Sequence, residues 1–599
     1  MPDQPAASSP SAPLSPRAQD TDPLDRRSFL AWTSSLGLAG TLFPGVLWAR
    51  MEGQEAITSQ MLAEAAKVAG LEFTEEEREM MVASVDRHRD AMLALREVKI
   101  SNSVPPAIHF EPQLPRTPLP VGESRCVPSR RADIRRPERL EEVAFWPVTH
   151  LAELIRTRQV TPSELTGMYL ERLKRHGPTL ECVVTLTEEL AWRQARRADD
   201  EIAAGNYRGP LHGIPWGAKD LLAVQGYPTT WGAPPYQNQV IDDDATVVTR
   251  LEQAGAILVA KLTLGSLAQG DVWFGGMTRN PWNLEQGSSG SSAGPAAATV
   301  AGLVGFGIGS ETLGSIVSPA TRCGATGLRP SFGRVSRAGA MALSWSMDKL
   351  GPLCRSVEDC ALVLHAIQGA DGRDSTARDV GFDWRGDGGG TTGTGAFGAM
   401  AGATGLGVQG LRVGYLQSAF EREREGPDFD TPVLEVLRRE GVELIPVELP
   451  DALPTGALSI ILSAEAGAAF DDLTRSGRDS LLVRQGPGAW PNTFRSSRMI
   501  PAVEYIQANR VRTLIMEALD DALSQIDVLV TPSYAPNLLL MTNLTGHPTV
   551  VLPNGFTDEG TPVSISFVGG LWKDAEAMRV ARLYQEATDF HRSRPEGFV

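Results

Sequence analysis

Apolar side chains recur at helical spacing shortly after the start of the chain. Met81 and Val85 belong to such a pattern, and Thr74 followed three residues later by Glu77 forms a capping box, in which each residue satisfies a backbone N–H of the other. The pattern predicts helices within residues 54–98.

Further along, short β-branched runs alternate with helical segments. Residues 256–260, 410–415 and 527–530 are apolar enough for buried strands, and Thr161-Pro162-Ser163-Glu164 is a strong helix start. Strands that alternate with helices are typical of an α/β domain. We therefore expect a mixed central β-sheet covered by helices on both faces.

Composition shifts divide the chain into segments. Residues 50–140 combine the predicted helices with a proline-rich arm from residue 104 onward, and we expect them to form an N-terminal helical extension. The main domain is predicted to span residues 141–599. Within it, residues 385–409 consist largely of Gly, Thr and Ala, which predicts a flexible loop.

Residues 1–49 look like a targeting segment. Arg26 and Arg27 precede an apolar stretch at residues 31–49 that glycines and a proline interrupt. This pattern resembles a twin-arginine export signal. The alternatives are a chance arginine pair before a buried helix, or a membrane anchor, for which the stretch is short. We expect a protein exported to the periplasm or beyond, without stable membrane insertion after processing.

Charge and cysteine content exclude several classes. The net charge of −16 and a pI of about 5.1 argue against a nucleic-acid-binding protein, which normally presents a basic face. The five cysteines include no Cys-x-x-Cys pair, so neither a zinc site nor another metal centre is expected. No cofactor motif stands out, and the oligomeric state is left open, a homodimer included.

Three segments carry candidate chemistry. Lys219 is the one lysine in the otherwise apolar run at residues 211–220, where it is either a strand-end surface residue or a buried one. A Gly/Ser run at residues 287–295 has the composition of a linker, but apolar small residues follow it at once. The third segment, residues 307–320, holds Ser315 between glycine-rich and apolar stretches, as in a turn or a nucleophile loop.

Together these segments resemble the amidase signature family. The resemblance covers about residues 145–590 and rests on Gly213-Ile214-Pro215 with Lys219-Asp220, the Gly/Ser run, and Gly307 to Ser315, then on Gly327-Leu328-Arg329-Pro330, Gly333-Arg334-Val335-Ser336, Asp348 with Gly351-Pro352, and Gly546-His547-Pro548. Four serines compete for one role in the Gly/Ser run. The family places its bridging serine about 24 residues before the nucleophile, and Ser291 meets that spacing to Ser315.

The resemblance implies a mechanism. Neutral Lys219 is the base, Ser291 relays the proton after a cis peptide bond from Gly290, and Ser315 attacks the amide carbonyl. The backbone N–H groups of Thr312, Leu313, Gly314 and Ser315 are expected to hold the oxyanion. The implied reaction is hydrolysis of a linear carboxamide through an acyl-enzyme, with a small-molecule amide as substrate and no metal or cofactor.

The chain departs from the family pattern at several positions. Leu313 replaces a usual glycine and narrows the approach to the oxyanion site, and Glu311 replaces a usual aspartate. Val317 replaces an arginine of many relatives, so an anionic substrate group is not expected there. Arg322 could compensate, although a structural or surface role is the simpler expectation.

Other interpretations remain open at this stage. Residues 290–294 also fit the Gly-x-Ser-x-Gly elbow of α/β-hydrolases, with Ser292 as nucleophile, but no buried apolar strand precedes them. The histidines are then expected to be structural or surface residues: His212, His365 and His547. A glutaminase-type subunit of an amidotransferase and a catalytically inactive amide-binding protein are the two remaining alternatives.

The substrate cannot be deduced from the motifs. The variable segment at residues 410–545 is expected to line an acyl pocket, and its apolar content suggests an apolar or aromatic acyl group. The residues behind that expectation are Ile460, Ile461, Leu462, Phe470 and Leu538 to Met541.

The twin-arginine hypothesis predicts where the protein is found. Replacing both Arg26 and Arg27 with lysine should retain the precursor in the cytoplasm, because the export pathway recognises the arginine pair. Immunoblotting of periplasmic and cytoplasmic fractions measures this, with Arg17→Lys as the control that leaves the pair intact. Unchanged fractionation of the double variant would contradict the hypothesis.

Overall fold

The computed structural model describes residues 57–96, 98, 101–106, 108–115, 119–120, 122–129, 133–386, 407–422 and 426–599. The predicted export signal and most of the glycine-rich segment lie outside these residues. By its contacts the chain divides into two units, Met1–Lys99 and Ile100–Val599. The described part of the proline-rich arm thus falls in the same unit as the sheet.

The described part of the smaller unit contains two helices, α3 (Ser59–Ala69) and α4 (Glu75–Arg96). Thr74 and Glu77 form the predicted capping box at the start of α4, because the N–H of Glu77 donates to Thr74 Oγ1 (3.3 Å) and the N–H of Thr74 donates to Glu77 Oε2 (2.7 Å). The helices expected within residues 54–98 are therefore confirmed.

In the described part of the larger unit, eleven strands form one sheet. In chain order they are β2 (Val183–Leu186), β3 (Pro215–Lys219), β4 (Ile257–Leu262), β9 (Phe306–Glu311), β10 (Thr326–Arg329), β11 (Lys349–Cys354), β13 (Val413–Leu416), β14 (Leu444–Val447), β15 (Val528–Pro532), β16 (Thr549–Phe556) and β17 (Pro562–Gly569). Three two-stranded ladders accompany it: β1 (Arg125–Val127) with β12 (Asp383–Arg385), β5 (Val272–Trp273) with β6 (Gly276–Met277), and β7 (Arg279–Asn280) with β8 (Asn283–Gly287).

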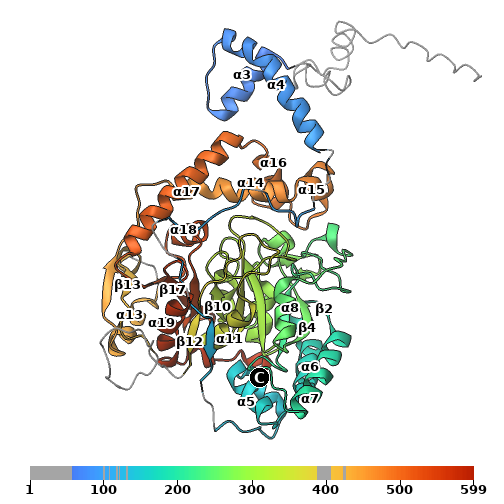
Figure 1. Cartoon of the computed structure of the whole chain (residues 1–599), viewed down its shortest axis with the longest axis vertical. Helices are drawn as coiled ribbons and strands as arrows, with labels where there is room; N and C mark the ends of the chain where they lie inside the picture. The colour runs from blue at the N-terminus through green and yellow to red at the C-terminus, as the bar shows by residue number, and fades with distance from the viewer. Residues whose placement is uncertain are drawn as a thin grey trace, which may run out of the picture. The chain divides into compact units, whose positions relative to one another are not determined.

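The sheet is mixed, as predicted. Its order is β14-β13-β15-β17-β16-β10-β11-β9-β3-β4-β2. Strand β3 runs parallel to both β4 and β9, whereas β9, β11, β10 and β16 alternate in direction. The carboxyl ends of the parallel neighbours β3 and β9 therefore lie side by side, and the carboxyl ends of strands are where α/β folds place their ligands. Figure 1 shows the sheet with helices around it.

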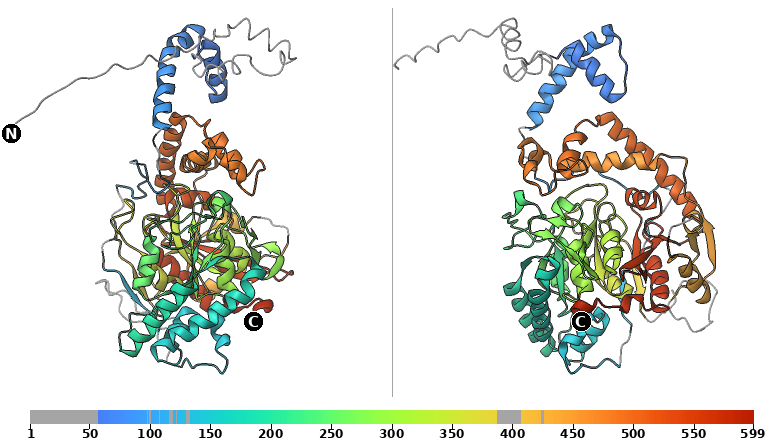
Figure 2. Two further views of the ribbon diagram at one scale, coloured as in Figure 1. Left: turned by 90° about the vertical axis from the view of Figure 1, so that its right-hand side faces the viewer. Right: turned by 180° about the vertical axis from the view of Figure 1, so that it is seen from behind.

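Helices surround the sheet. They are α5 (Val148–Arg156), α6 (Pro162–Leu180), α7 (Glu188–Ala203), α8 (Thr246–Gln253), α9 (Ala293–Val300), α10 (Val317–Cys323), α11 (Val357–Ile367), α12 (Gln417–Phe420), α13 (Thr431–Arg439), α14 (Ser459–Ala469), α15 (Asp471–Arg475), α16 (Trp490–Ser497), α17 (Ala502–Leu523), α18 (Leu538–Thr545) and α19 (Asp574–Glu586). In Figure 2, right, α6 and α7 (teal) cover one end of the sheet and α19 (dark red) lies toward the other.

The two faces of the sheet bury separate hydrophobic cores. Helices α11 and α19 pack on one face, and α9 and α10 pack on the other. Alternation along the strands supplies both cores: Leu258 faces the first core, whereas its neighbours Ile257 and Val259 face the second. Two-sided burial explains why the strand sequences read as continuous apolar runs rather than as alternating ones.

Local sequence signals set most element boundaries. Thr161 and Glu164 form the predicted capping box of α6, and the runs at residues 256–260 and 527–530 correspond to β4 and β15. The strand expected from Gly410 begins only at Val413. Gly410 has a φ of 82°, a left-handed conformation that turns the chain before the strand can start.

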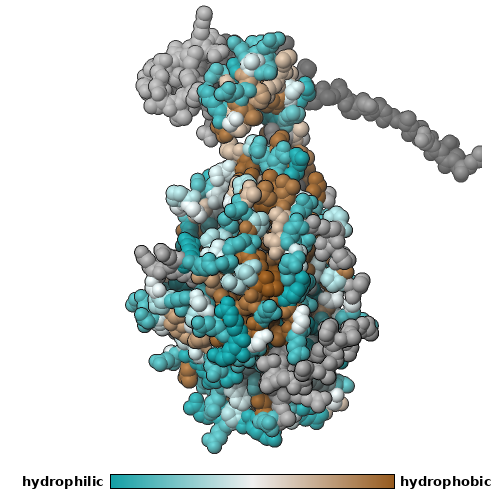
Figure 3. All heavy atoms as spheres, turned by 90° about the vertical axis from the view of Figure 1, so that its left-hand side faces the viewer, coloured by the Kyte–Doolittle hydropathy of each residue, from teal (hydrophilic) through white to brown (hydrophobic). Residues whose placement is uncertain are grey.

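Helix α17 carries apolar side chains on its outer face. Val503, Ile506 and Leu514 are exposed, while Ile515 and Leu519 point into the core. Figure 3 shows such apolar surface mixed with polar side chains on this side of the molecule. Charged residues interrupt α17, and no helix in the described part of the chain is long and apolar enough to span a membrane.

The five cysteines are free thiols. Cys182, Cys323, Cys354 and Cys360 are buried, and Cys126 is partly buried. Burial raises the pKa of Cys126 and of Cys182 to about 12. These thiols therefore stay protonated at neutral pH, as is typical of structural cysteines.

Candidate active site

Lys219 lies at the carboxyl end of β3 with its side chain completely buried. Its Nζ is 2.8 Å from Ser291 Oγ, 3.1 Å from Ser292 Oγ and 2.8 Å from Ser310 Oγ. Three hydroxyl groups thus surround the amine. The surface alternative for Lys219 is excluded, because the side chain has no access to solvent.

Ser291 lies in the tightly packed loop between β8 and α9. The peptide bond between Gly290 and Ser291 is cis, as the resemblance implies. A Cβ on Gly290 would lie 1.9 Å from the carbonyl oxygen of Gly270, so no other residue fits there. Ser288, Ser291 and Ser292 are buried, which rules out a flexible linker for this Gly/Ser run.

Ser315 follows β9 and precedes α10. The N–H of Ser292 donates to the carbonyl oxygen of Ser315 (3.1 Å), which ties the two serine loops together. The hydroxyl of Ser315 makes no hydrogen bond to a described residue. Ser315 as a whole is 9% exposed to solvent. The contact between Lys219 and Ser291 is therefore formed, whereas the hydroxyls of Ser291 and Ser315 are not joined by a hydrogen bond. Such contacts are often long in the absence of substrate.

The Glu311 carboxylate holds the backbone next to Ser315. Its Oε2 accepts the N–H groups of Ile316 (2.8 Å) and Val317 (3.0 Å), and its Oε1 accepts from Arg329 (2.7 Å) and Asn543 (2.8 Å). Burial would raise the pKa of Glu311, but Arg329 and the hydrogen bonds lower it to about 2. The group stays ionised and fixes the turn that carries Ser315.

Burial also sets the ionisation of Lys219. It lowers the pKa of this lysine well below the ordinary value, and the negative charges of Asp348 and Glu311 oppose the shift only in part. Asp220, the next residue along the chain, is instead engaged by Lys261 at 2.8 Å. Lys219 makes no ion pair with a described carboxylate, so burial disfavours its charged form.

The hydrogen bonds of Ser292 fix part of the orientation of the Lys219 amine. Ser292 Oγ donates its proton to the carbonyl oxygen of Ser310 (3.0 Å), so it can only accept from Lys219. A neutral amine has two N–H donors and one lone pair. One N–H is therefore committed to Ser292. The other N–H and the lone pair face Ser291 Oγ and Ser310 Oγ, and the Ser310 carbonyl oxygen is a further acceptor 3.5 Å from Nζ.

A cavity of about 710 Å³ opens beside Ser310 and Thr312. Aromatic side chains line much of it: Trp231, Tyr236, Trp345 and Phe470. Phe470 was among the residues expected to line a pocket, but most of the lining comes from segments outside residues 410–545. A cavity of this size suits a small organic molecule with an apolar part.

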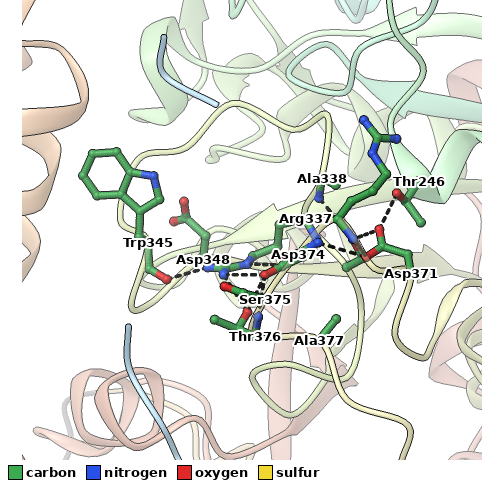
Figure 4. Close-up of polar contacts among 12 residues, drawn as sticks. Thr246, Arg337, Ala338, Trp345, Asp348, Asp371, Asp374, Ser375, Thr376 and Ala377 are labelled. Carbon is green, nitrogen blue, oxygen red and sulfur yellow. Dashed lines mark hydrogen bonds and ion pairs between the residues drawn. The ribbon is translucent and has the colours of Figure 1, made fainter. Parts of the chain in front are cut away.

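Three arginines line the cavity, and each is paired with an aspartate. The pairs are Arg337 with Asp374 (2.9 Å), Arg478 with Asp472 (3.2 Å) and Arg373 with Asp243. Arg337 also donates to the Trp345 carbonyl (2.6 Å) and to Thr376 Oγ1 (2.7 Å), contacts visible in Figure 4. The positive charges at the cavity wall are thus already neutralised.

The histidines lie away from the serine loops. His212 contacts Glu201 (3.1 Å), His365 stacks on Phe382, and His547 contacts Thr545 (2.7 Å). None of them touches Ser292, so the elbow-type triad is not assembled. No cluster of metal-ligating side chains occurs in the described part of the chain.

Comparisons with known proteins identify the family of this chain. A model of the family described as Amidase matches residues 164–540. The chain belongs to the amidase signature family. Among curated proteins, a glutamyl-tRNA(Gln) amidotransferase subunit from Roseiflexus castenholzii is 34% identical over 494 residues, which cover 75% of this chain and 97% of the relative.

Solved structures of the family share the fold. The native peptide amidase of Stenotrophomonas maltophilia superposes with a TM-score of 0.63 at 30% identity, covering 76% of this chain and 98% of the other. A bacterial aryl acylamidase shares the fold at 21% identity and a TM-score of 0.65, covering 75% of this chain and 98% of the other. The amidase signature fold predicted from the motifs is therefore confirmed.

Residues that depart from the amidase pattern surround Ser315. Leu539 Cδ2 would lie 3.2 Å from a Cβ on Gly314, so apolar groups crowd the loop that also carries Leu313. Val317 is buried, and Arg322 points outward and donates to Gln286 (3.2 Å). Arg322 thus takes the surface role expected for it and does not replace the missing arginine.

Two amidase site residues escaped the sequence analysis. Ser310 contacts the Lys219 amine directly, yet it is an ordinary serine inside a buried strand. Asp348 accepts from Thr312 Oγ1 (2.6 Å) and from the N–H of Leu343 (2.8 Å). It was noted only as part of a family motif. Ser310 lies near the carboxyl end of β9 and Asp348 directly precedes the antiparallel neighbour β11, so a polar side chain at the end of a buried strand is the signal that could have identified both.

The buried Glu311 carboxylate should contribute strongly to stability. Glu311→Gln keeps one acceptor but leaves Arg329 uncompensated, so the free energy of unfolding in urea should fall by roughly 3 kcal/mol near neutral pH. Because the pKa of Glu311 is lowered to about 2 in the folded protein, this difference should shrink as the pH falls from about 4.5 through 2. The exposed Glu285→Gln on β8 is the control. Equal stabilities of the two variants would contradict the assignment.

Proposed function

We propose that this amidase hydrolyses a neutral carboxamide, with Ser315 as nucleophile and with Ser291 and Lys219 as the proton relay. The observation that carries the proposal is the buried Lys219 amine, held 2.8 Å from Ser291 Oγ with no ion pair to a described carboxylate. A neutral amine in that place is a base, and a base beside a serine chain is what amide attack requires.

The proposed steps conserve every proton. Lys219 accepts the proton of Ser291 while Ser291 accepts that of Ser315, and Ser315 Oγ bonds to the carbonyl carbon. The backbone N–H groups of residues 312–315 stabilise the oxyanion. The C–N bond then breaks, and the departing amine receives its proton back from Lys219 through Ser291. Water attacks the resulting ester along the same path and releases the acid.

The hydroxyls around Lys219 give the relay its direction. Since Ser292 must accept one N–H, the lone pair is left for Ser291 when the other N–H points to Ser310, whose Oγ (2.8 Å) and carbonyl oxygen (3.5 Å) can both accept it. Ser292 and Ser310 are therefore positioning residues in this proposal. They turn the lone pair of Lys219 toward Ser291 without contacting the substrate carbonyl.

The cavity supports an uncharged aromatic or apolar group on the substrate. Trp231, Tyr236 and Phe470 offer ring surfaces, with Trp231 and Tyr236 centroids 4.5 Å apart. All three arginines of the lining are engaged by aspartates. An anionic substrate would have to displace one of these pairs, whereas a neutral amide needs no such exchange.

A glutaminase-type component of an amidotransferase is the second candidate. The similarity to glutamyl-tRNA(Gln) amidotransferase subunits favours it, since those relatives are matched over nearly their whole length. Glutamine carries an ammonium and a carboxylate near the scissile side chain, so its recognition calls for unpaired charges of both signs. The paired arginines of the cavity favour the neutral amide. A catalytically inactive amide-binding protein is the remaining alternative.

Hydrolysis assays with two substrates test the proposed function. The wild-type protein should hydrolyse phenylbutyramide with a higher kcat/KM than L-glutamine, and Ser315→Ala should reduce both rates by at least about a thousand-fold because the nucleophile is lost. Ammonia release and labelling by a fluorophosphonate probe provide the measurements, and circular dichroism confirms that the variant is folded.

Other outcomes distinguish the alternatives. Preferred hydrolysis of glutamine would support the amidotransferase component instead. Activity in Ser315→Ala together with inactivity in Ser292→Ala would show that Ser292 is the nucleophile. A folded wild-type protein that binds amides but neither hydrolyses them nor reacts with the probe would be a binding protein.

The protonation state of Lys219 should govern the pH profile. Because burial lowers its pKa well below the ordinary value, kcat/KM should rise with pH through one ionisation that lies well below pH 10.5. Lys219→Met and Lys219→Arg should each lower kcat by roughly a thousand-fold or more, since neither can accept a proton. The exposed Lys174→Arg is the control. Near-normal kcat in Lys219→Arg would show that a fixed charge suffices and would end the relay hypothesis.

A further inference from the structure

The cavity beside the serine loops is lined in part by a segment that precedes the family domain. Ser101, Asn102, Ser103 and Pro105 belong to its lining, although the family match begins only at residue 164. Residues 101–103 directly precede the proline-rich arm, and Pro105 belongs to it. The wall of this cavity is therefore built by the amidase domain together with a stretch of chain outside it.

Asn102 attaches the start of the arm, two residues before Val104, to two segments of the cavity wall. Its Oδ1 accepts the N–H of Ala342 (2.7 Å), and its Nδ2 donates to the carbonyl oxygens of Ala342 (2.9 Å) and Ala469 (3.4 Å). Both donors and the acceptor of the amide are thus used. Ala342 lies between β10 and β11, and Ala469 is the last residue of α14, so one side chain joins three segments.

A second attachment follows further along the arm. The guanidinium of Arg512 lies 3.5 Å from the ring centroid of Phe110, and Gln113 Oε1 accepts from Trp572 Nε1 (2.7 Å). The chain is therefore attached to the amidase domain at Asn102, beside the cavity, and again at Phe110 and Gln113. Its described residues between these attachments have no cluster of buried apolar side chains, so the hydrogen bonds of Asn102 carry most of the hold at the cavity.

The segment that contains Ala342, to which Asn102 is hydrogen-bonded, also contains Arg337, whose charge is paired with Asp374. Residues 337–345 include Arg337, whose pairing with Asp374 is drawn in Figure 4, and Ala340, Met341 and Leu343 line the cavity beside it. The other segment to which Asn102 is hydrogen-bonded leads directly into Phe470. Asn102 thus holds the segment of residues 337–345, which supplies aliphatic and polar lining, at a fixed distance from the segment that carries Phe470.

We propose that residues 101–105 are a strap that closes the substrate cavity and that Asn102 is the specificity-determining residue which holds it. The proposal rests on the proposed function, since it assigns the cavity to the remote part of a neutral amide. A substrate whose aromatic end extends to the strap gains contacts with it. The KM and kcat of a substrate too short to reach the strap do not depend on it, because Asn102 touches none of Lys219, Ser291 or Ser315.

A homologous series of amides tests the strap. In Asn102→Ala, KM for the longer members of the series phenylacetamide, phenylbutyramide and phenylhexanamide should rise about ten-fold, as expected for the loss of one to two net hydrogen bonds. KM for propionamide and kcat for all members should stay unchanged. Asn492→Ala is the matched control, because Asn492 lies on α16 and bonds only to the Pro487 carbonyl (2.9 Å).

A second variant and a second readout keep the test independent of folding and of turnover. Asn102→Asp retains the acceptor for the Ala342 N–H but removes both donors, so it should shift KM in the same direction. Calorimetric binding of phenylhexanamide to Ser315→Ala, with and without Asn102→Ala, reports the strap without any catalysis. A ten-fold loss of affinity there supports the strap even if the protein hydrolyses none of these amides.

The outcomes separate the two proposals. A KM that rises equally for propionamide and phenylhexanamide, or for none of them, overturns the strap and leaves the proposed function standing. Unchanged affinity in the calorimetric comparison does the same. Absence of hydrolysis by the wild-type protein, with length-dependent binding retained, overturns the proposed function alone.

Discussion

A fully buried lysine amine without a carboxylate partner among the described residues is the constraint on which the rest of this structure depends. Lys219 has no carboxylate partner among the described residues, and the charged form of a lysine so placed is expensive. The hydroxyls of Ser291, Ser292 and Ser310, rather than an anion, are the side-chain hydrogen-bond partners of this amine. Hydroxyls satisfy the hydrogen-bonding capacity of a neutral amine without adding a negative charge that would favour its protonation, so they leave in place the lowering of the Lys219 pKa by burial.

The surrounding architecture serves that placement. Parallel strands β3 and β9 bring Lys219 and Ser310 to the same sheet edge, and the loop before α9 delivers Ser291 from the other side. Anionic groups are nearby but occupied: Glu311 is neutralised by Arg329, and Asp220 by Lys261. Pairing these buried charges limits their attraction for a proton on Lys219, and Asp348 and Glu311 offset the effect of burial only in part.

Family motifs and local signals predicted much of this from the sequence. Caps such as Thr161 with Glu164 are local, and Lys219, Ser291 and Ser315 stand in motifs whose spacing is distinctive, so their positions could be assigned. Ser310 and Asn102 could not, because their importance arises from contacts across the fold: Asn102 bonds to residues 240 and 367 positions away. No pattern near Asn102 distinguishes it from any other polar residue beside a proline-rich arm. The late start of β13 was missed because Gly410 adopts a left-handed turn before an otherwise continuous apolar run.

The state of the cysteines has a practical consequence for chemical biology. A reactive thiolate would compete with serine for any electrophilic reagent. Here Cys182 and Cys323 are buried, and burial raises the pKa of both thiols, while that of Cys126 is raised to about 12. Thiolate concentrations at these positions are negligible at neutral pH. An electrophile that modifies the folded protein would therefore discriminate among its hydroxyl groups with little interference from these three sulfur atoms.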